Sequence, residues 1–359
     1  MRRGLISWNR EELPASALDA RVARLQSAMR AQGMGAVLAY TSFAQPAPVQ
    51  WLSNFIPYWS EALLVVLPQG MPTMLVALTP RVHFWIREIC HVGELIAAPK
   101  VGAQAAELLG KQLAADARVG VIGLDALPWT VAQPLLAGGW GPRLADATQL
   151  YNSVRHPADE AEHGMARKGL ALAERALAAV PAAERQTAGV IVAVDGAARR
   201  GGAEEVLPRI APDLAGGATL LRMESVAALG ERYAVDCSLA YKGVWVRAVR
   251  SVARGAQPAS WAAAEAWFDR TLQGIGGPES IADLVADAPG RLTGWTLEAS
   301  TGAAPLSVVT ANGQPATLPL GLPTGSLAVF SVQLALQDGP WLRGAPLRIG
   351  SGALAAAAA

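Results

Sequence analysis

The strongest structural signal in the chain is the stretch AVDCSLAYKGVWVRAVRSVARG, residues 234–255. Its apolar side chains recur at every second position on both sides of AYKG, residues 240–243, as in two antiparallel β-strands joined by a turn. A turn centred in AYKG places Asp236 opposite Arg247. This pairing collects the apolar residues on one face of the hairpin, whereas a slip of one residue would scatter them over both faces. The sequence therefore predicts a β-hairpin with a carboxylate and a guanidinium on its second face.

Two interpretations of this polar face stay open. The predicted register also places Ser238 opposite Trp245, beside Asp236 and Arg247. On a solvent-exposed face the charged pair is an ordinary cross-strand ion pair, which stabilises the hairpin by about 0.2–1 kcal/mol. On a covered face the same residues could form a binding or catalytic site. The surrounding fold has to distinguish these possibilities.

The sequence before the hairpin has an α/β pattern. Short apolar runs of strand length alternate with helical segments, so residues 1–150 are predicted to form an α/β domain. The predicted strands are residues 35–40, 61–68, 72–78, 93–99 and 118–124, and the predicted helices are residues 17–31, 80–90 and 103–115.

The second half of the chain has an α+β pattern. Turn-forming residues mark 151–157 as a linker, residues 158–354 as a second domain, and residues 355–359 as an Ala-rich tail. Its predicted strands are residues 218–224, 232–241, 243–252, 292–299, 305–310, 327–336 and 342–349. Its predicted helices are residues 158–180, 184–200, 258–273 and 279–287, although the run VIVAV inside the second of these fits a strand equally well by periodicity.

The overall composition excludes several classes of protein. The 359 residues include 30 Lys and Arg against 29 Asp and Glu, so no net field attracts nucleic acid or an anionic membrane. Apolar runs are short and broken, and the first residues lack the features of a secretory signal, so we expect a cytoplasmic protein. The four histidines, at positions 83, 91, 156 and 163, all precede the predicted second sheet, which leaves that sheet without an imidazole as metal ligand or base.

The order of these segments resembles the creatinase, prolidase and aminopeptidase P family. The first half is similar to the creatinase-type domain, with VQWLSNF, residues 49–55, in the place of a strand and tight turn. The stretch YNSVRHPADEAEHGMARKGLALAERAL is similar to the entry into the catalytic domain of that family. The resemblance implies a pita-bread fold: an α/β domain followed by a curved antiparallel sheet flanked by helices.

The same resemblance implies a change in the active site. The family holds two divalent metals with two Asp, one His and two Glu. Asp236 matches the first Asp, but Arg247 stands at the second, and Trp295 stands at the His. The two Glu positions match Gln333 and Gly350. The resemblance therefore implies that most metal ligands are replaced, and we expect no metal and no other cofactor.

The functional expectation is a pseudoenzyme. A catalytically inactive or metal-independent homologue would bind a peptide, a small molecule or a protein partner through the former active-site cleft, without nucleic acid or membrane, as a homodimer. One alternative is a metal-independent hydrolase or lyase on a small C–N substrate, since creatinase works without metal. A weaker alternative is an Xaa-Pro peptidase. The candidate ligand-binding residues are Asp236, Arg247, Trp295, Gln333, Trp245, Ser238, Glu298, Glu224 and Arg222.

Overall fold

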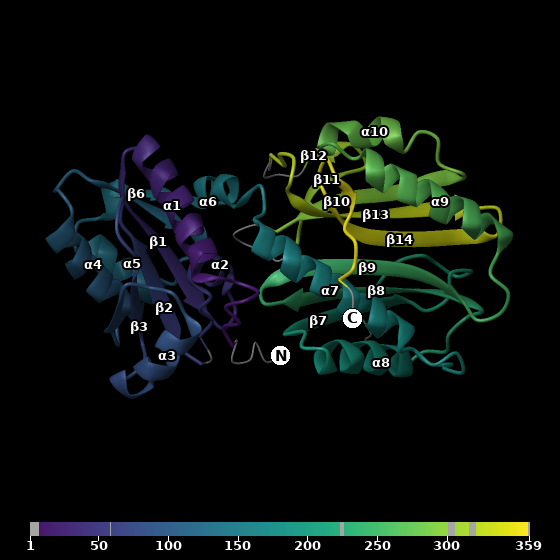
Figure 1. The fold of residues 1–359 in the computed structure, drawn as a ribbon, viewed down its shortest axis with the longest axis horizontal. Coiled ribbons are helices and arrows are strands. Elements are labelled where there is room, and N and C mark those ends of the chain that lie inside the picture. The colour runs from purple at the N-terminus through teal and green to yellow at the C-terminus, as the bar shows by residue number, and fades with distance from the viewer. Residues whose placement is uncertain (1–6, 58, 223–225, 301–305, 316–320, 358–359) are drawn as a thin grey trace. The chain divides into compact units, whose positions relative to one another are not determined.

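The computed structural model describes residues 7–57, 59–222, 226–300, 306–315 and 321–357 (Figure 1). These residues divide into two compact units, one formed by residues up to 155 and the other beginning at residue 156. The segment expected to be a linker, residues 151–157, is helical as far as Arg155, at the end of helix α6 (Thr148–Arg155). Within the described residues, no helix is both long and apolar enough to cross a membrane.

The first unit contains a mixed six-stranded sheet with the order β4-β3-β2-β1-β5-β6. Its strands are β1 (Met34–Ser42), β2 (Glu61–Val66), β3 (Thr73–Val76), β4 (Glu94–Ala97), β5 (Arg118–Ile122) and β6 (Leu144–Asp146). Its helices, besides α6, are α1 (Ala15–Ala31), α2 (Ala47–Ser53), α3 (His83–Ile89), α4 (Val101–Gln112) and α5 (Trp129–Ala137), with short 3₁₀ turns at Pro80–Val82, Leu124–Ala126 and Gly141–Arg143.

One element of the first unit differs from the sequence expectation. Residues 49–55, expected as a strand and tight turn, belong mainly to helix α2. Pro48 lies in the first turn of this helix, where its missing N–H costs nothing, and the helix ends at Asn54, which adopts a left-handed conformation with φ 63°. Helix α5 and strand β6 were not predicted. The α/β class of this half is confirmed.

The second unit contains an antiparallel nine-stranded sheet. Eight strands follow the order β12-β11-β10-β13-β14-β9-β8-β7, and β15 pairs with β14. The strands are β7 (Glu205–Ala211), β8 (Arg232–Tyr241), β9 (Val244–Ala253), β10 (Arg291–Ala299), β11 (Ser307–Ala311), β12 (Gln314–Pro315), β13 (Leu327–Leu336), β14 (Gly339–Arg348) and β15 (Gly352–Ala353). The helices are α7 (Glu160–Ala178), α8 (Thr187–Arg200), α9 (Ala259–Gly274) and α10 (Ile281–Leu284), with a 3₁₀ turn at Pro278–Ser280.

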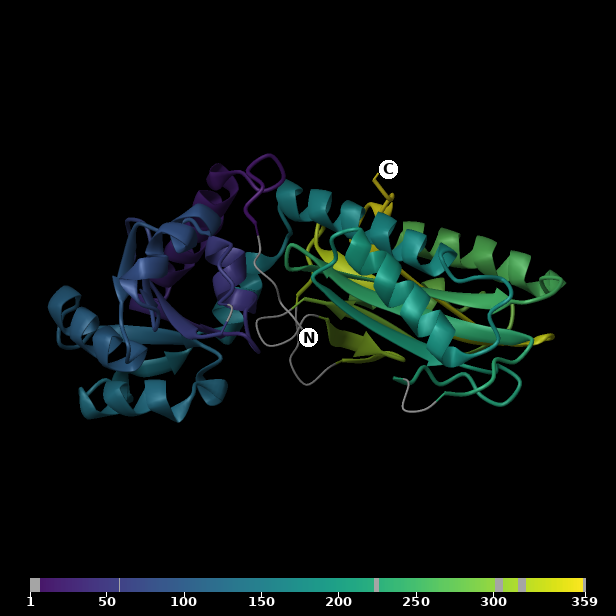
Figure 2. The same ribbon diagram turned by 90° about the horizontal axis from the view of Figure 1, so that it is seen from below.

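The helices α7, α8 and α9 lie on the same side of this sheet (Figure 2). We call the covered side the outer face, which carries Cys237, Leu239 and Val246, and the opposite side the inner face, which carries Asp236 and Arg247. Val246 and Leu239 approach α7 at Gly169, where an added Cβ would lie 3.1 and 3.6 Å from their methyl groups. The run VIVAV, residues 190–194, is helical within α8: Val190 and Val194, four residues apart, are buried, and Val192 between them is exposed.

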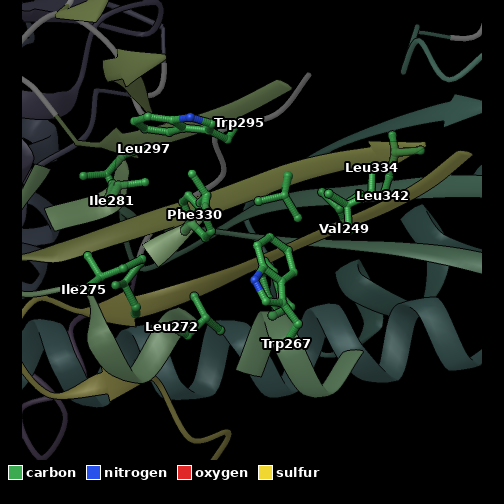
Figure 3. Close-up of a cluster of buried hydrophobic side chains, with 14 of the residues drawn as sticks. Val249, Trp267, Leu272, Ile275, Ile281, Trp295, Leu297, Phe330, Leu334 and Leu342 are labelled. Carbon is green, nitrogen blue, oxygen red and sulfur yellow. The ribbon is translucent and has the colours of Figure 1, made fainter. Parts of the chain in front are cut away.

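The outer face carries an aromatic core (Figure 3). Phe268 of α9 stacks on Phe330 of β13 with ring centroids 5.9 Å apart, and Trp341 of β14 meets Phe268 edge-on at 6.3 Å. All three rings are fully buried, and each side chain of this kind stabilises the fold by about 1.5–3 kcal/mol. This core holds α9 against β13 and β14.

The second unit has three strands that the sequence did not predict, β7 and the two-residue strands β12 and β15, and lacks one that it did. Strand β7 was missed because Pro208 interrupts its pattern. Residues 218–224, expected as a strand, form none within their described part. Leu221 makes only an isolated bridge to Ile210 on the free edge of β7.

Candidate functional site

The β8–β9 hairpin positions the candidate site. Its turn consists of Lys242 and Gly243, whose φ angles of 49° and 79° are those of a tight two-residue turn with both residues left-handed. The predicted turn centre was one residue too early, so the predicted register is wrong by two residues. Asp236 lies opposite Val249, and Ser238 lies opposite Arg247. A shift of two keeps every side chain on its face, so the predicted polar face is retained.

Asp236 is the centre of a cluster of charged side chains on the inner face. Arg209 of β7 lies directly opposite it and donates from Nε to its Oδ2 at 2.6 Å, with Nη2 directed at the same oxygen. Ser238 Oγ donates to its Oδ1 at 2.9 Å. Arg247 Nε lies 3.5 Å from Oδ2 and donates to Ser238 Oγ at 2.8 Å. The expected proximity of Asp236 and Arg247 is therefore confirmed, with the carboxylate fully buried.

Glu298 of β10 completes this group, which we call the arginine–carboxylate cluster: Arg209, Asp236, Ser238, Arg247 and Glu298. Arg247 Nη1 donates to Glu298 Oε2. Strands β14 and β13 separate β9 from β10, roughly 14 Å across a flat sheet, so the two side chains extend toward each other over the inner face. Burial raises the pKa of the Glu298 carboxyl, and the Arg247 guanidinium opposes that effect. The cluster holds two cations and two carboxylates and has no net charge.

The sheet between Arg247 and Glu298 is closely packed. At Gly344 of β14, an added Cβ would lie 2.7 Å from Ser331 Oγ and 2.8 Å from a methyl group of Val249. The neighbouring part of the inner face is apolar, since Val249 and Leu342 belong to the same buried cluster as Leu214, from the segment after β7. The polar site is therefore confined to the arginine–carboxylate cluster and its immediate neighbours.

Trp295 does not fill the site. It lies opposite Val332 and packs 6.2 Å from the Phe330 ring in the aromatic core of the outer face (Figure 3). Glu298 is three positions further along β10 and therefore points to the opposite face. Thr296, one residue after Trp295, is the residue of this strand that shares the face of Glu298. The expectation that Trp295 occupies the former metal position is wrong.

The remaining predicted site residues are not members of the arginine–carboxylate cluster. Trp245 is partly buried on the inner face, opposite Ala240 rather than Ser238. Gln333 shares the face of Glu298, opposite Leu342. Arg222 is exposed in the loop after Leu221, and Glu224 lies outside the described residues.

Two further positions bear on the site. Gly350 follows β14 in a turn with φ 75°, a conformation that a glutamate would adopt only with strain. Arg209 was missed because β7 was not recognised. The alternation of Glu205, Leu207 and Arg209 on one face against Val206 and Ile210 on the other could have revealed it.

The residues of the inner face do not fit a di-metal centre. Within the described part of the chain, no group of three or more His, Cys, Asp or Glu side chains is arranged to hold a metal ion. Asp236 and Glu298, the two carboxylates of the cluster, both already bond to guanidinium groups. Arginine stays charged at any accessible pH, so a dication here would face two permanent cations. The charges of the cluster therefore oppose the binding of a divalent metal.

Comparison with known proteins gives the family of the first unit and the fold of the whole. Residues 21–156 match the creatinase/prolidase N-terminal domain. No characterised protein sequence is similar enough to match the chain directly. The structure is similar to dipeptidase PepE from Mycobacterium ulcerans, with 17% identity, a TM-score of 0.65 and coverage of 96% of this chain and 97% of that one.

Two further solved structures are similar to this chain to a comparable degree. Prolidase from Pyrococcus furiosus gives 12% identity, a TM-score of 0.68 and coverage of 94% and 99% of the two chains. Proline aminopeptidase P II from Yersinia pestis gives 12% identity, a TM-score of 0.70 and coverage of 96% of each chain. Residues 21–156 thus form a creatinase/prolidase N-terminal domain, and the chain as a whole has the pita-bread fold of the prolidases and aminopeptidase P.

Proposed function

We propose that this protein is a metal-independent homologue of the prolidases and aminopeptidase P that binds a ligand on the inner face of its second sheet. The observation that carries the proposal is the pairing of the buried Asp236 carboxylate with both Arg209 and Arg247. The ligand is a small molecule, a peptide or a protein segment. The homodimer expected from the resemblance belongs to the same proposal.

Electrostatics favours this function over metal-dependent hydrolysis. Two unit charges 4 Å apart interact by about 4 kcal/mol at an effective dielectric constant of 20, and a dication doubles that value. A metal bound to Asp236 would displace one arginine and be repelled by the other. Removing Arg247 from Glu298 would in turn leave a second buried carboxylate without its partner.

Glu298 supports one alternative function. A buried carboxyl with a raised pKa can act as a general base or acid, and Arg247 could orient an anionic group of a small C–N substrate. This would make the protein a metal-independent hydrolase or lyase. Its weakness is that Glu298 is already bonded to Arg247. The names of the similar structures support a third function, the cleavage of Xaa-Pro peptides. Arg209 and Arg247 argue against the metal-dependent form of this reaction, because their charges repel a divalent metal.

Metal content and peptidase activity test the proposal together. We expect the purified protein to carry no stoichiometric Mn, Co, Zn or Fe and to leave Xaa-Pro dipeptides and longer peptides intact when Mn²⁺ or Co²⁺ is added. The Pyrococcus furiosus prolidase, treated identically, is the positive control. Two metal ions per chain, or cleavage restored by Mn²⁺, would refute the proposal. Metal-free release of amine from creatine-like or amide substrates would establish the alternative.

A matched pair of variants tests the reason for the expected lack of metal. Arg247→Asp should increase Mn²⁺ binding, measured by calorimetry, because it exchanges a cation beside Asp236 for a ligand oxygen. Arg270→Asp makes the same charge change on α9. Among the described residues, the Arg270 guanidinium bonds only to the Ala266 carbonyl of its own helix. Equal Mn²⁺ binding by the two variants would show that Arg247 does not exclude the metal.

A further inference from the structure

Arg209 differs from the other charged groups of the arginine–carboxylate cluster in its exposure. Its side chain is 35% exposed, against 14% for Arg247 and 0% for Asp236. Its Nε and Nη2 are directed at Asp236 Oδ2. The edge formed by Nη1 and Nη2 has no other hydrogen-bond partner among the residues that the structure describes. A rigid guanidinium, anchored on one edge, therefore keeps donors on its second edge for a ligand.

Two partly apolar side chains share the inner face with Arg209. Leu207 precedes Arg209 by two residues on β7 and shares its face, and Trp245 lies on the same face two strands away. Both side chains are only partly buried. Further along β7 the same face carries Glu205, a buried carboxylate roughly 13 Å from Arg209 by strand geometry. Leu207 thus lies between Arg209 and Glu205 along β7, and Trp245 is level with Glu205, across Ala240 of β8.

We propose that the inner face binds a monocarboxylate with an aromatic or other flat apolar body. The carboxylate accepts two hydrogen bonds from the Nη1–Nη2 edge of Arg209, because the planar fork of arginine matches the two oxygens of a carboxylate. The body lies over Leu207 and Trp245, and Glu205 disfavours a second negative charge on the ligand. This inference rests on the proposed function, since it assigns a ligand class to the same face.

Calorimetry with three matched probes tests the ligand class. We expect phenylacetate to bind the wild-type protein, and phenylacetamide and the dianionic phenyl phosphate to bind more weakly. Equal binding of the amide, or tighter binding of phenyl phosphate, would overturn the proposal. N-acetyl-Gly-Phe and its C-terminal amide determine whether the carboxylate belongs to a free acid or to the end of a peptide.

Variants test the role of each side chain. Arg209→Gln should weaken phenylacetate binding by about tenfold or more, because it removes a charge-assisted bidentate contact. Arg270→Gln, the same change on the outer side of the sheet, should bind like the wild type. Trp245→Ala leaves the cluster intact and should weaken phenylacetate more than acetate, which decides the matter if Arg209→Gln does not fold.

The outcomes separate this inference from the proposed function. A protein that is free of metal and inactive as a peptidase, but binds phenylacetate independently of Arg209 and Trp245 or not at all, refutes only the assignment of the ligand. A protein that contains two metals refutes the proposed function and this inference with it.

Discussion

Strand β1 of the first sheet and strand β8 of the second are both largely buried, but by different residues. In β1 of the first sheet, Ala36 and Leu38 pack into one apolar core and Val37 and Ala39 into another, so both faces are apolar. In β8 of the second sheet, one face is apolar and the other carries the fully buried Asp236. An apolar set would stabilise the second sheet as well as an ion-pair cluster does. The difference therefore calls for a role of the inner face other than stability, and ligand binding is the role proposed above.

The largest expected effect comes from removing the centre of the cluster. Asp236→Ala leaves Arg209 and Arg247 without their shared carboxylate and should lower the free energy of unfolding by about 3–5 kcal/mol. Denaturant unfolding followed by circular dichroism measures the loss. Asp195→Ala is the matched control, because it breaks an exposed ion pair to Arg199 on α8 and should cost no more than about 1 kcal/mol. Equal losses in the two variants would mean that the inner-face charges are as dispensable as surface charges.

A smaller effect measures the coupling within the cluster. Asp236→Ala combined with Arg247→Ala should cost less than the sum of the two single changes, by about 1–3 kcal/mol, because each single change strands the other charge. The three variants and the wild type are compared by the same unfolding measurement. Additivity within about 0.5 kcal/mol would show that Asp236 and Arg247 do not interact. The inner face of the second sheet would then lack the coupled charges that distinguish it from the first sheet.

The smallest expected effect concerns a buried histidine on the outer side of the second sheet. His163 of α7 is fully buried, and neither ring nitrogen has a hydrogen-bond partner within the described residues. Burial lowers its pKa, with Arg348 and Arg167 adding to this effect and Glu160 and Glu162 opposing it. Because the unfolded chain takes up the proton more readily, this group reduces stability as the pH falls below about 6.5.

The matching measurement compares His163→Leu with the wild type at pH 7.5 and pH 5. The free energy of unfolding should fall less in the variant on acidification. The difference between the two proteins is the quantity to follow, because burial also raises the pKa of Glu204 to about 7, which stabilises the folded protein as the pH falls. Identical pH dependence in the two proteins would contradict the assignment of acid sensitivity to His163.

The sequence predicted the face of the sheet on which a side chain lies better than it predicted which residues pair across two strands. Strict alternation of apolar and polar residues placed Asp236, Ser238 and Arg247 on one face. The turn lies one residue later than predicted, which shifts the register by two residues and leaves each side chain on its predicted face. Lysine is an unusual residue at a left-handed turn position, so Lys242 gave no signal of the true turn. The long helices α1, α7 and α9 were predictable because their apolar periodicity extends over several turns.

The errors in the site have equally specific causes. Arg209 could not be placed before β7 was known, and Pro208 hides that strand. Trp295 was assigned by resemblance to a ligand position. The pairing of β10 with β11 and with β13 contains register shifts, which determine which residues of β10 point to each face. Trp295 points to the outer face as a result. A resemblance at this level of identity carries over the order of elements but not a side-chain direction that depends on a single residue.

Pro208 has one more effect, on how this protein behaves at high concentration. Strand β7 is at the end of its sheet, where unpaired backbone groups could recruit a strand from another molecule. The Ile210 N–H and carbonyl on that open side are bonded to Leu221, and Pro208, two residues earlier, has no N–H to offer on the same side. The residue that obscures the strand in the sequence therefore also protects the folded chain against edge-to-edge aggregation.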